Sequence, residues 1–374
     1  MTPLHGSSYI EEIMKRILQV AASLHIGGAE KVARDIGLYA DPNKYEVHYI
    51  VFSDAIGDYE QELLELGCKI YHWKYPRENY PAYFRALLTL MQANHYDAVH
   101  AHTMFSIGWA MLAARLCGVP IRIAHAHSAM GSDKSIKRQI YEKVMRPLIL
   151  RNATTLVACG NAAGIKLYGK SAYEKRGICI LNGIDTSAFS YDPEARARIR
   201  KELALEDSFV IGHVGHLNSV KNQSFLIRLM PRILKRKPNA KLLMLGDGDD
   251  RPKLQRLIKK HDLEDCVIMT GNVRNVPDYL SAMAVFAFPS RFEGMPLSIV
   301  EGQANGLPCV LSTGVPRDVY LTDLIHPLSL DCVDDWIDRI CSLKRDNPSR
   351  YAALLKEAGF DKEGFINAIM KLYQ

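Results

Sequence analysis

The sequence predicts an α/β protein made of two doubly wound parallel-sheet domains that face each other across a cleft. The chain has 374 residues, more than a single hydrophobic core usually supports. Short apolar runs of strand length alternate with segments whose apolar residues recur at three- and four-residue spacing. This alternation restarts after residue 208. Apolar strands that alternate with helices indicate parallel sheets covered on both faces.

The strand-like runs form two series, one in each half of the chain. The first series comprises residues 15–23, 46–53, 69–73, 98–102, 121–128 and 155–160. The second comprises residues 209–215, 241–248, 266–272, 284–290 and 308–312. Helical spacing is clearest between them, for example at 30–40 and 109–118. Ligands of such sheets bind beyond the carboxyl ends of the strands, so the residues after each run are the candidates for function.

An Asn-Gly pair among polar residues marks 181–189 as the connection between the domains. We therefore expect a first domain over 1–185 and a second over 186–358. Residues 1–13 lack the apolar run of a signal peptide, and we expect a loose extension there. Over 359–374 we expect a last helix that packs back on the first domain. Its apolar stripe comprises Phe365, Ile366, Ile369 and Met370.

The composition is that of a globular protein and argues against several functional classes. The formal net charge of +6 is too small and too dispersed for a nucleic-acid-binding protein. No run approaches the roughly 18 apolar residues of a membrane span. The eight cysteines include no C-x-x-C pair and lie mostly in apolar runs, which is typical of reduced thiols in a cytoplasmic protein.

Glycines follow two of the strand-like runs. Gly27 and Gly28 end the first run and open a helix, an arrangement that lets a ligand anion approach the backbone closely. The dinucleotide fingerprint G-x-G-x-x-G is absent, and an ordinary tight turn explains this pair equally well. Gly246 and Gly248 are more typical of a structural turn than of a nucleotide site.

His216 and Lys221 flank a short loop that follows residues 209–215. A lysine at this edge of a sheet suits a diphosphate, which needs charge-assisted hydrogen bonds once it is partly desolvated. Most single lysines are only solvated, so the position after a strand is what favours a functional role here.

Two histidine pairs end neighbouring runs, His100 with His102 and His125 with His127. Residues two apart share one face of a strand, so each pair points the same way. Metal clusters usually add carboxylate or cysteine ligands, and we expect no metal here. We expect His100 and His125 to be buried and hydrogen-bonded, and His102, the last residue of its run, to be the better candidate for contact with a substrate.

Glu293 and Glu301 lie on either side of Pro296, a favourable first residue for a helix that we expect to reach about Asn305. Eight residues along one helix would place the carboxylates ~12 Å apart, too far for a shared metal or a close catalytic pair. With Glu293 in the preceding loop, they suit two parts of one elongated ligand, and the helix N-terminus between them suits an anion. A polyhydroxyl group, a diphosphate and a ribose in series describe a nucleotide sugar.

Seven motifs together resemble the retaining glycosyltransferases of family 4, which have two Rossmann-like domains (the GT-B fold), and in particular the bacterial exopolysaccharide and capsule enzymes. They run in the family's order over nearly the whole chain. The last is long and specific, whereas the first alone is a weak signal. The motifs are HIGGAE, VHAHT, RIAHAHS, LNGID, HVGHLNSVKN, LMLGDGD and PSRFEGMPLSIVEGQANGLPCVLS.

The resemblance assigns roles to these residues. It implies that Glu293 holds hydroxyls of the donor sugar, that Glu301 holds the ribose, and that Lys221 neutralises the diphosphate. The backbone of Gly294, Met295, Pro296, Leu297 and Ser298 would cradle the diphosphate, and the Gly27–Gly28 loop would close over it. The strand end at Val273 and Arg274 would meet the base, His102 would lie near the transferred sugar, and His127 on the acceptor side. The family often has Arg where this chain has His216, which leaves the strength of its phosphate contact in question.

The resemblance further implies transfer with retention, without a metal or other cofactor, from a nucleotide sugar that is most simply a UDP-sugar. The acceptor it implies is a saccharide on a polyprenyl diphosphate. Residues 132–151 hold six basic and two acidic residues beside Ile136, Ile140, Met145, Leu148 and Ile149. Such a segment suits peripheral attachment to the anionic inner face of a plasma membrane, and an ordinary solvated helix face suits it equally.

Three other functions remain open from the sequence. A UDP-sugar epimerase shares the two-domain plan and would convert the donor without an acceptor. A non-catalytic protein that binds a nucleotide sugar would show no turnover. A nicotinamide-dependent dehydrogenase is the weakest alternative, because no G-x-G-x-x-G follows any strand.

Overall fold

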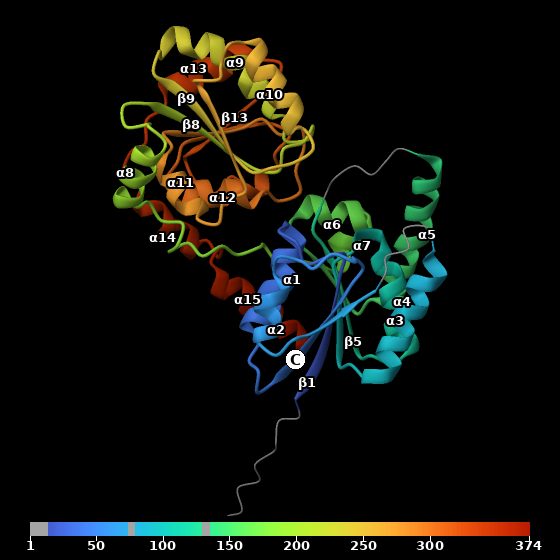
Figure 1. The fold of residues 1–374 in the computed structure, drawn as a ribbon. Helices are drawn as coiled ribbons and strands as arrows, with labels where there is room; N and C mark the ends of the chain where they lie inside the picture. Colours follow the sequence, from blue (N-terminus) through green and yellow to red (C-terminus); the bar gives the residue numbers. More distant parts are fainter. Residues whose placement is uncertain (1–13, 74–78, 129–134) are drawn as a thin grey trace, which may run out of the picture.

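The computed structural model of the chain describes residues 14–73, 79–128 and 135–374. The extension expected at residues 1–13 lies outside the described residues. The described residues form two α/β domains, one above the other in Figure 1, each with a parallel sheet between helices. The expected fold class, two doubly wound parallel-sheet domains, is therefore confirmed.

The first domain contains a seven-stranded parallel sheet with the order β3-β2-β1-β4-β5-β6-β7. Its strands are β1 (Lys15–Ala21), β2 (Tyr45–Val51), β3 (Lys69–His72), β4 (Ala98–Ala101), β5 (Ile121–Ala126), β6 (Thr155–Ala158) and β7 (Gly177–Cys179). Its helices are α1 (Gly28–Tyr39), α2 (Glu60–Glu65), α3 (Tyr80–Asn94), a 3-10 turn (Met104–Ser106), α4 (Ile107–Leu116), α5 (Ile136–Asn152), α6 (Asn161–Tyr168) and α7 (Lys170–Arg176).

The second domain contains a six-stranded parallel sheet with the order β10-β9-β8-β11-β12-β13. Its strands are β8 (Phe209–Val214), β9 (Ala240–Leu245), β10 (Val267–Gly271), β11 (Val285–Phe288), β12 (Cys309–Ser312) and β13 (Ile325–Leu328). Its helices are α8 (Pro193–Glu202), α9 (Gln223–Arg236), α10 (Arg251–Lys260), α11 (Val276–Ala282), α12 (Leu297–Ala304), a 3-10 turn (Arg317–Val319), α13 (Val333–Ser342) and α14 (Arg350–Glu357).

The structure adds two strands that the sequence patterns do not reveal, β7 and β13. Both are last in their sheets; β7 has only three residues, and β13 contains a histidine and a proline. The helix expected to begin at Pro296 begins one residue later, at Leu297, with Pro296 as its N-terminal cap. Among the described helices, none is long and apolar enough to cross a membrane.

The chain returns to the first domain at its end. Helix α15 (Lys362–Met370) and a following 3-10 turn (Lys371–Tyr373) run beside the first sheet, as the red segment of Figure 1 shows. Phe365, Ile366 and Ile369 pack there in one buried cluster with strand residues such as Ile17 and Ile123. The apolar stripe expected in this helix thus covers one face of the sheet.

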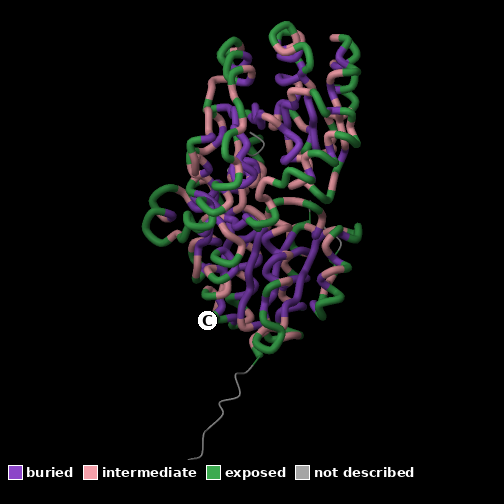
Figure 2. The backbone as a smooth tube through the Cα atoms, turned by 90° about the vertical axis from the view of Figure 1, so that its left-hand side faces the viewer, coloured by how far each residue is buried: buried purple, intermediate pink, exposed green. Residues whose placement is uncertain are grey.

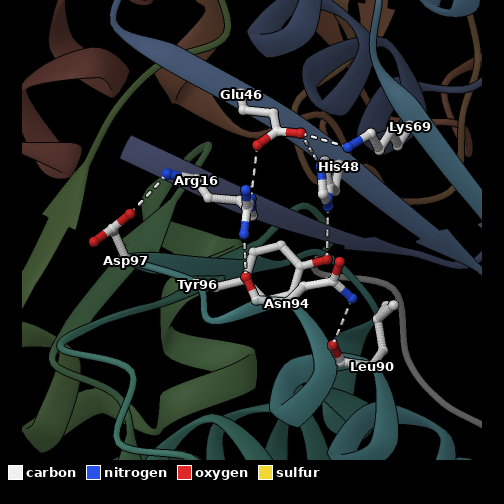
Figure 3. Close-up of polar contacts among 8 residues, drawn as sticks. All are labelled: Arg16, Glu46, His48, Lys69, Leu90, Asn94, Tyr96 and Asp97. Atoms are coloured by element: carbon white, nitrogen blue, oxygen red, sulfur yellow. Dashed lines mark hydrogen bonds and ion pairs between the residues drawn. The ribbon is translucent and has the colours of Figure 1, made fainter. Parts of the chain in front are cut away.

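Burial follows the two sheets, which form the purple interior of both domains in Figure 2. At the amino ends of its strands, the first sheet instead carries a group of charged and polar side chains that contact one another (Figure 3). Glu46 accepts hydrogen bonds from Lys69 at 2.7 Å, His48 at 2.9 Å and Arg16 at 2.7 Å. The first two of these bonds, from Lys69 and then His48, do most to lower the pKa of Glu46 to about 2. This group lies at the amino ends of its strands, away from the cleft, and joins β1, β2 and β3.

Candidate active site

The carboxyl ends of the two sheets face each other across a pocket of about 320 Å³. The first domain contributes Ile26 and Gly27, from the loop after β1. The second domain contributes the strand ends, among them Gly215, His216 and Val273. The pocket therefore brings together Gly27, His216 and Val273, which are distant in sequence and were each assigned to the donor. Its position is the one at which doubly wound folds bind ligands.

The glycines of the second domain allow two strand ends to approach each other. Gly246 has a φ of +123°, and a Cβ there would lie 2.3 Å from the carbonyl oxygen of Gly215. Only glycine tolerates that combination of conformation and contact. The turn expected at Gly246 and Gly248 therefore shapes the wall of the pocket.

Lys221 is held at the cleft by the loop that follows β8. The side chain of Asn218 accepts a hydrogen bond from the backbone N–H of Lys221 at 2.9 Å. Its Nζ lies 4.7 Å from the centre of the Phe288 ring and 2.8 Å from an oxygen of Glu293. The two candidate residues thus neutralise each other. A diphosphate would draw the ammonium toward itself and release the carboxylate for hydroxyl groups.

The segment from Gly294 to Ser298 joins the loop of Glu293 to α12. Met295 packs against the cores of both domains. The first N–H groups of α12 have no carbonyl partners within the helix, so this end carries partial positive charge. With Lys221, this edge of the cleft therefore has two sources of positive charge.

Glu301 lies in α12 and faces the first domain. Its side chain is 13% exposed, and one carboxylate oxygen lies 3.9 Å from Nζ of Lys31 in α1. Burial raises the pKa of Glu301, and the nearby Lys31 charge partly opposes this effect. The pair crosses the cleft, so a ligand that binds Glu301 also meets Lys31.

The Gly27–Gly28 turn opens α1 as expected, but the first turn of this helix already contains a carboxylate, that of Glu30. A Cβ on Gly27 would lie 2.3 Å from Oε2 of Glu30. Burial raises the pKa of Glu30, whose own backbone N–H stabilises the charged form. A phosphate that approaches this turn has to compete with that carboxylate. Gly28 has open space around it.

The four histidines lie together at the ends of β4 and β5. His100 Nε2 lies 3.0 Å from His125 Nδ1, and His102 Nδ1 lies 2.8 Å from His127 Nε2. Nitrogens of His100, His102 and His125 come within 4.8 Å of one another, close enough to share a cation. However, the facing nitrogens of His100 and His125 lie at hydrogen-bonding distance, and their rings are within 12° of parallel. Hydrogen bonding between the rings accounts for this arrangement.

Burial favours the neutral form of all four rings. Burial lowers the pKa of His100, His102 and His125 well below the usual value, and that of His127 to about 3. Both ring nitrogens of His102 are engaged inside the protein, by His127 and by Gln19. In His127, by contrast, Nδ1 has no hydrogen-bond partner among the described residues. Nε2 of His125 likewise lacks a partner there, so two nitrogens of the group are left, and that of His127 lies nearer the carboxyl end of its strand.

Several contacts at this site escape sequence reasoning: two join residues far apart in the chain, and one is a side chain that folds back over its own turn. They are the Lys31–Glu301 pair, the Glu30 carboxylate, and the bond from the Asn161 N–H to Asp318 across the domains at 3.1 Å. The HIGGAE motif was a signal for the first two, since Lys31 follows it directly. Arg274 is exposed beside the pocket.

Comparison with known proteins agrees with this architecture. Residues 26–188 match the family model described as Glycosyltransferase Family 4, and residues 195–355 match the model described as Glycosyl transferases group 1. Fold and site thus define a two-domain glycosyltransferase. The chain belongs to glycosyltransferase family 4, because its first domain matches that family model and a glycosyltransferase aligned over 96% of both chains is 31% identical to it.

That relative is the putative glycosyltransferase EpsF of Bacillus subtilis, aligned over 371 residues that cover 96% of each chain. The capsular polysaccharide biosynthesis glycosyltransferase CapH of Staphylococcus aureus is 26% identical over 82% of this chain and 83% of its own. An Escherichia coli UDP-Gal:alpha-D-GlcNAc-diphosphoundecaprenol alpha-1,3-galactosyltransferase is 29% identical over 61% of this chain and 60% of its own. Among solved structures, Anabaena HepE in complex with UDP-glucose has a TM-score of 0.78 at 21% identity and covers 95% of this chain and 98% of its own.

Proposed function

We propose that this glycosyltransferase moves a sugar from a UDP-sugar to a saccharide carried on a polyprenyl diphosphate, with retention of configuration and without a metal or other cofactor. The observation that carries the proposal is the row formed by Glu293, Lys221, the start of α12 and Glu301 along one side of the cleft. The order is carboxylate, cation, helix N-terminus, carboxylate. It is complementary to sugar hydroxyls, diphosphate and ribose in series.

In this proposal, the charge that develops on the leaving diphosphate is stabilised by Lys221 and the N–H groups of α12. Such preorganised electrostatic stabilisation commonly provides the largest part of catalysis. His216 lines the pocket between the sheet ends and would add a hydrogen-bonding group there. The departing phosphate oxygen receives the proton of the acceptor hydroxyl as the new bond forms on the same face of the sugar. Closure of the domains over the donor excludes water and so limits hydrolysis.

The names of relatives support the choice of substrates. The Escherichia coli relative is named for a UDP-sugar donor and a diphosphoundecaprenol-linked acceptor, and HepE was solved with UDP-glucose. Membership of a glycosyltransferase family favours transfer over the epimerase and dehydrogenase alternatives.

A peripheral membrane position fits the surface of α5. Ile136, Ile140 and Val144 recur every four residues on this helix and are 76%, 58% and 52% exposed. Met145 and Ile149, from the same segment, are instead buried in the core. Residues 132–134 of the basic segment lie outside the described residues. An exposed apolar stripe beside lysines at 137 and 143 suits an anionic bilayer that carries the lipid-linked acceptor.

The test is a transfer assay with UDP-glucose, UDP-galactose, UDP-N-acetylglucosamine and GDP-mannose as donors and an undecaprenyl-diphosphate-linked N-acetylglucosamine as acceptor. We expect acceptor-dependent release of UDP from one donor, unchanged in EDTA, and a product whose anomeric configuration by NMR equals that of the donor. Conversion of the donor without acceptor would instead indicate an epimerase. Binding without turnover of any donor would indicate a non-catalytic protein, and loss of activity in EDTA would refute metal independence.

A further inference from the structure

A row of polar residues crosses the face of the first sheet that α15 covers. Gln19 in β1 lies beside His100 in β4 in the strand register, and His125 in β5, two positions beyond the register partner of His100, contacts His100 directly. All three are fully buried, on a face otherwise lined by residues such as Ile17 and Ile123. Polar groups buried in apolar surroundings are costly unless they are hydrogen-bonded. This row therefore needs a polar partner from whatever covers the sheet.

Tyr373 is that partner. It follows α15, is fully buried, and packs in the apolar cluster of that face. Its hydroxyl lies 2.6 Å from Nδ1 of His100 and receives a hydrogen bond of 3.0 Å from the Gln19 amide nitrogen. The backbone carbonyl of Tyr373 accepts a bond of 2.9 Å from Nζ of Lys15, which fixes the segment at the start of β1. A hydroxyl from the far end of the chain thus reaches the histidine group.

The Gln19 amide gives the hydrogen bonds a direction. Its oxygen faces Nε2 of His102 at 2.9 Å, so that nitrogen carries the proton. The other nitrogen of His102 then accepts, and the proton of its bond with His127 must come from His127 Nε2. His127 Nδ1 is left unprotonated, with no partner among the described residues.

The hydrogen bonds that run from Tyr373 through His100 to His125 can be assigned in the same way. The hydroxyl of Tyr373 accepts from Gln19, and Nδ1 of His100 is the one acceptor that its own buried proton has among the described residues, so it donates to that nitrogen. His100 then carries its proton on Nε2 and donates to Nδ1 of His125. His125 is left with its proton on Nε2, a buried nitrogen that has no hydrogen-bond partner among the described residues. Every ring in the group thus has the same tautomer. The Gln19 amide directs the His102–His127 pair, the Tyr373 hydroxyl directs the His100–His125 pair, and the two groups are hydrogen-bonded to each other.

We propose that Tyr373 and Gln19 are positioning residues that hold all four histidines in the Nε2–H tautomer, so that His127 presents an unprotonated Nδ1 at the carboxyl end of β5. Neither positioning residue contacts the substrate. An unprotonated nitrogen accepts a hydrogen bond from a hydroxyl, and the substrates in question are polyhydroxylated. The catalytic meaning of this arrangement rests on the proposed glycosyl transfer, whereas the tautomers themselves do not.

The first test is NMR of the protein labelled with nitrogen-15 in histidine, because long-range proton–nitrogen spectra distinguish the two neutral tautomers. Single substitutions assign the four rings. We expect Nε2–H signals for all four in the unmodified protein. In Tyr373→Phe, the Gln19 amide loses the acceptor that distinguishes its two ends, so His102 and His127 become mixtures of tautomers. The Nδ1–H tautomer in the unmodified protein, or spectra unchanged in Tyr373→Phe, would overturn the proposal.

Tyr351→Phe is the matched control. This tyrosine is also buried, but its hydroxyl contacts Arg350 in the second domain. We expect unchanged tautomers there, and a thermal melt verifies that both variants fold. In the transfer assay, Tyr373→Phe should lower kcat roughly fivefold, the effect of one neutral hydrogen bond, without changing KM for the donor. Absence of transfer in the unmodified protein would refute the proposed function alone, because the spectra still decide on the tautomers.

Discussion

Replacement of Glu301 by glutamine isolates the charge of the second carboxylate. The substitution preserves the size of a side chain that is 13% exposed and lies 3.9 Å from Nζ of Lys31. If Glu301 binds the ribose, it accepts hydrogen bonds from the ribose hydroxyls, and an amide accepts them less strongly. We therefore expect Glu301→Gln to weaken binding of UDP itself, whichever sugar the donor carries.

The size of the effect follows from the charge and burial of the group. A hydrogen bond to a charged group contributes about 1.5–3 kcal/mol, so loss of one such bond corresponds to roughly a 10- to 150-fold increase in Kd. The contact with Lys31 is long and partly exposed, and such pairs contribute at most about 1 kcal/mol. Its loss therefore cannot offset the change. The net increase expected in Kd is therefore roughly 2- to 150-fold.

The pH dependence supplies a second signature. Burial raises the pKa of Glu301, so its carboxylate takes up a proton at a higher pH than an ordinary glutamate. The ionised form is the better acceptor for the ribose hydroxyls. UDP affinity should therefore fall as the pH is lowered through this raised pKa, and Glu301→Gln should remove that part of the profile.

Isothermal titration calorimetry with UDP provides the assay, and Glu293→Gln provides the control. The control makes the same chemical change in the carboxylate assigned to the sugar, and it releases Lys221 from the 2.8 Å pair. We expect it to bind UDP at least as tightly as the unmodified protein. Binding of UDP by Glu301→Gln within twofold of the unmodified protein would refute the assignment. So would an equal loss in both variants.

Four further predictions concern the cleft, the surface and the sheet. Lys221→Ala should raise the Kd for UDP roughly tenfold or more by removal of a charge-assisted phosphate contact, as calorimetry would show. His216→Arg should tighten UDP binding, since guanidinium is permanently charged and bidentate; an unchanged Kd would mean that the side chain does not reach the phosphates. Ile140→Glu should reduce co-sedimentation with phosphatidylglycerol vesicles, and Leu354→Glu, exposed in the second domain, should not. Glu46→Gln should lower the melting temperature near pH 7. Because the pKa of Glu46 is lowered to about 2 in the folded protein, this difference should shrink as the pH falls from about 5 toward 2, and a gap independent of pH would contradict it.

The sequence predicts the two sheets well, because strands buried on both faces leave continuous apolar runs. Two edge strands do not show that pattern. Strand β7 has only three residues, two of them exposed, and strand β13 contains a proline. The residues assigned to the donor could be selected from the sequence for a similar reason. Glu293, the start of α12 and Glu301 lie within one short segment, so local spacing describes their geometry. The contact of Glu301 with Lys31 depends on how two domains meet, and no local pattern records it.

The histidines show most clearly where the sequence stops being informative. Period-two spacing predicts that His100 and His102 point to the same side, and in the structure their rings are stacked with centroids 4.4 Å apart. It does not say which nitrogen is free, because that depends on Gln19 and Tyr373, which are 354 positions apart. The stripe of apolar residues in α15 predicts that the helix docks, yet the residue that meets the polar row lies beyond the helix. A face of a sheet that contains Gln19 and buried histidines needs a hydroxyl or amide from its covering segment. That requirement, rather than any motif, distinguishes Tyr373 from the other tyrosines of the chain.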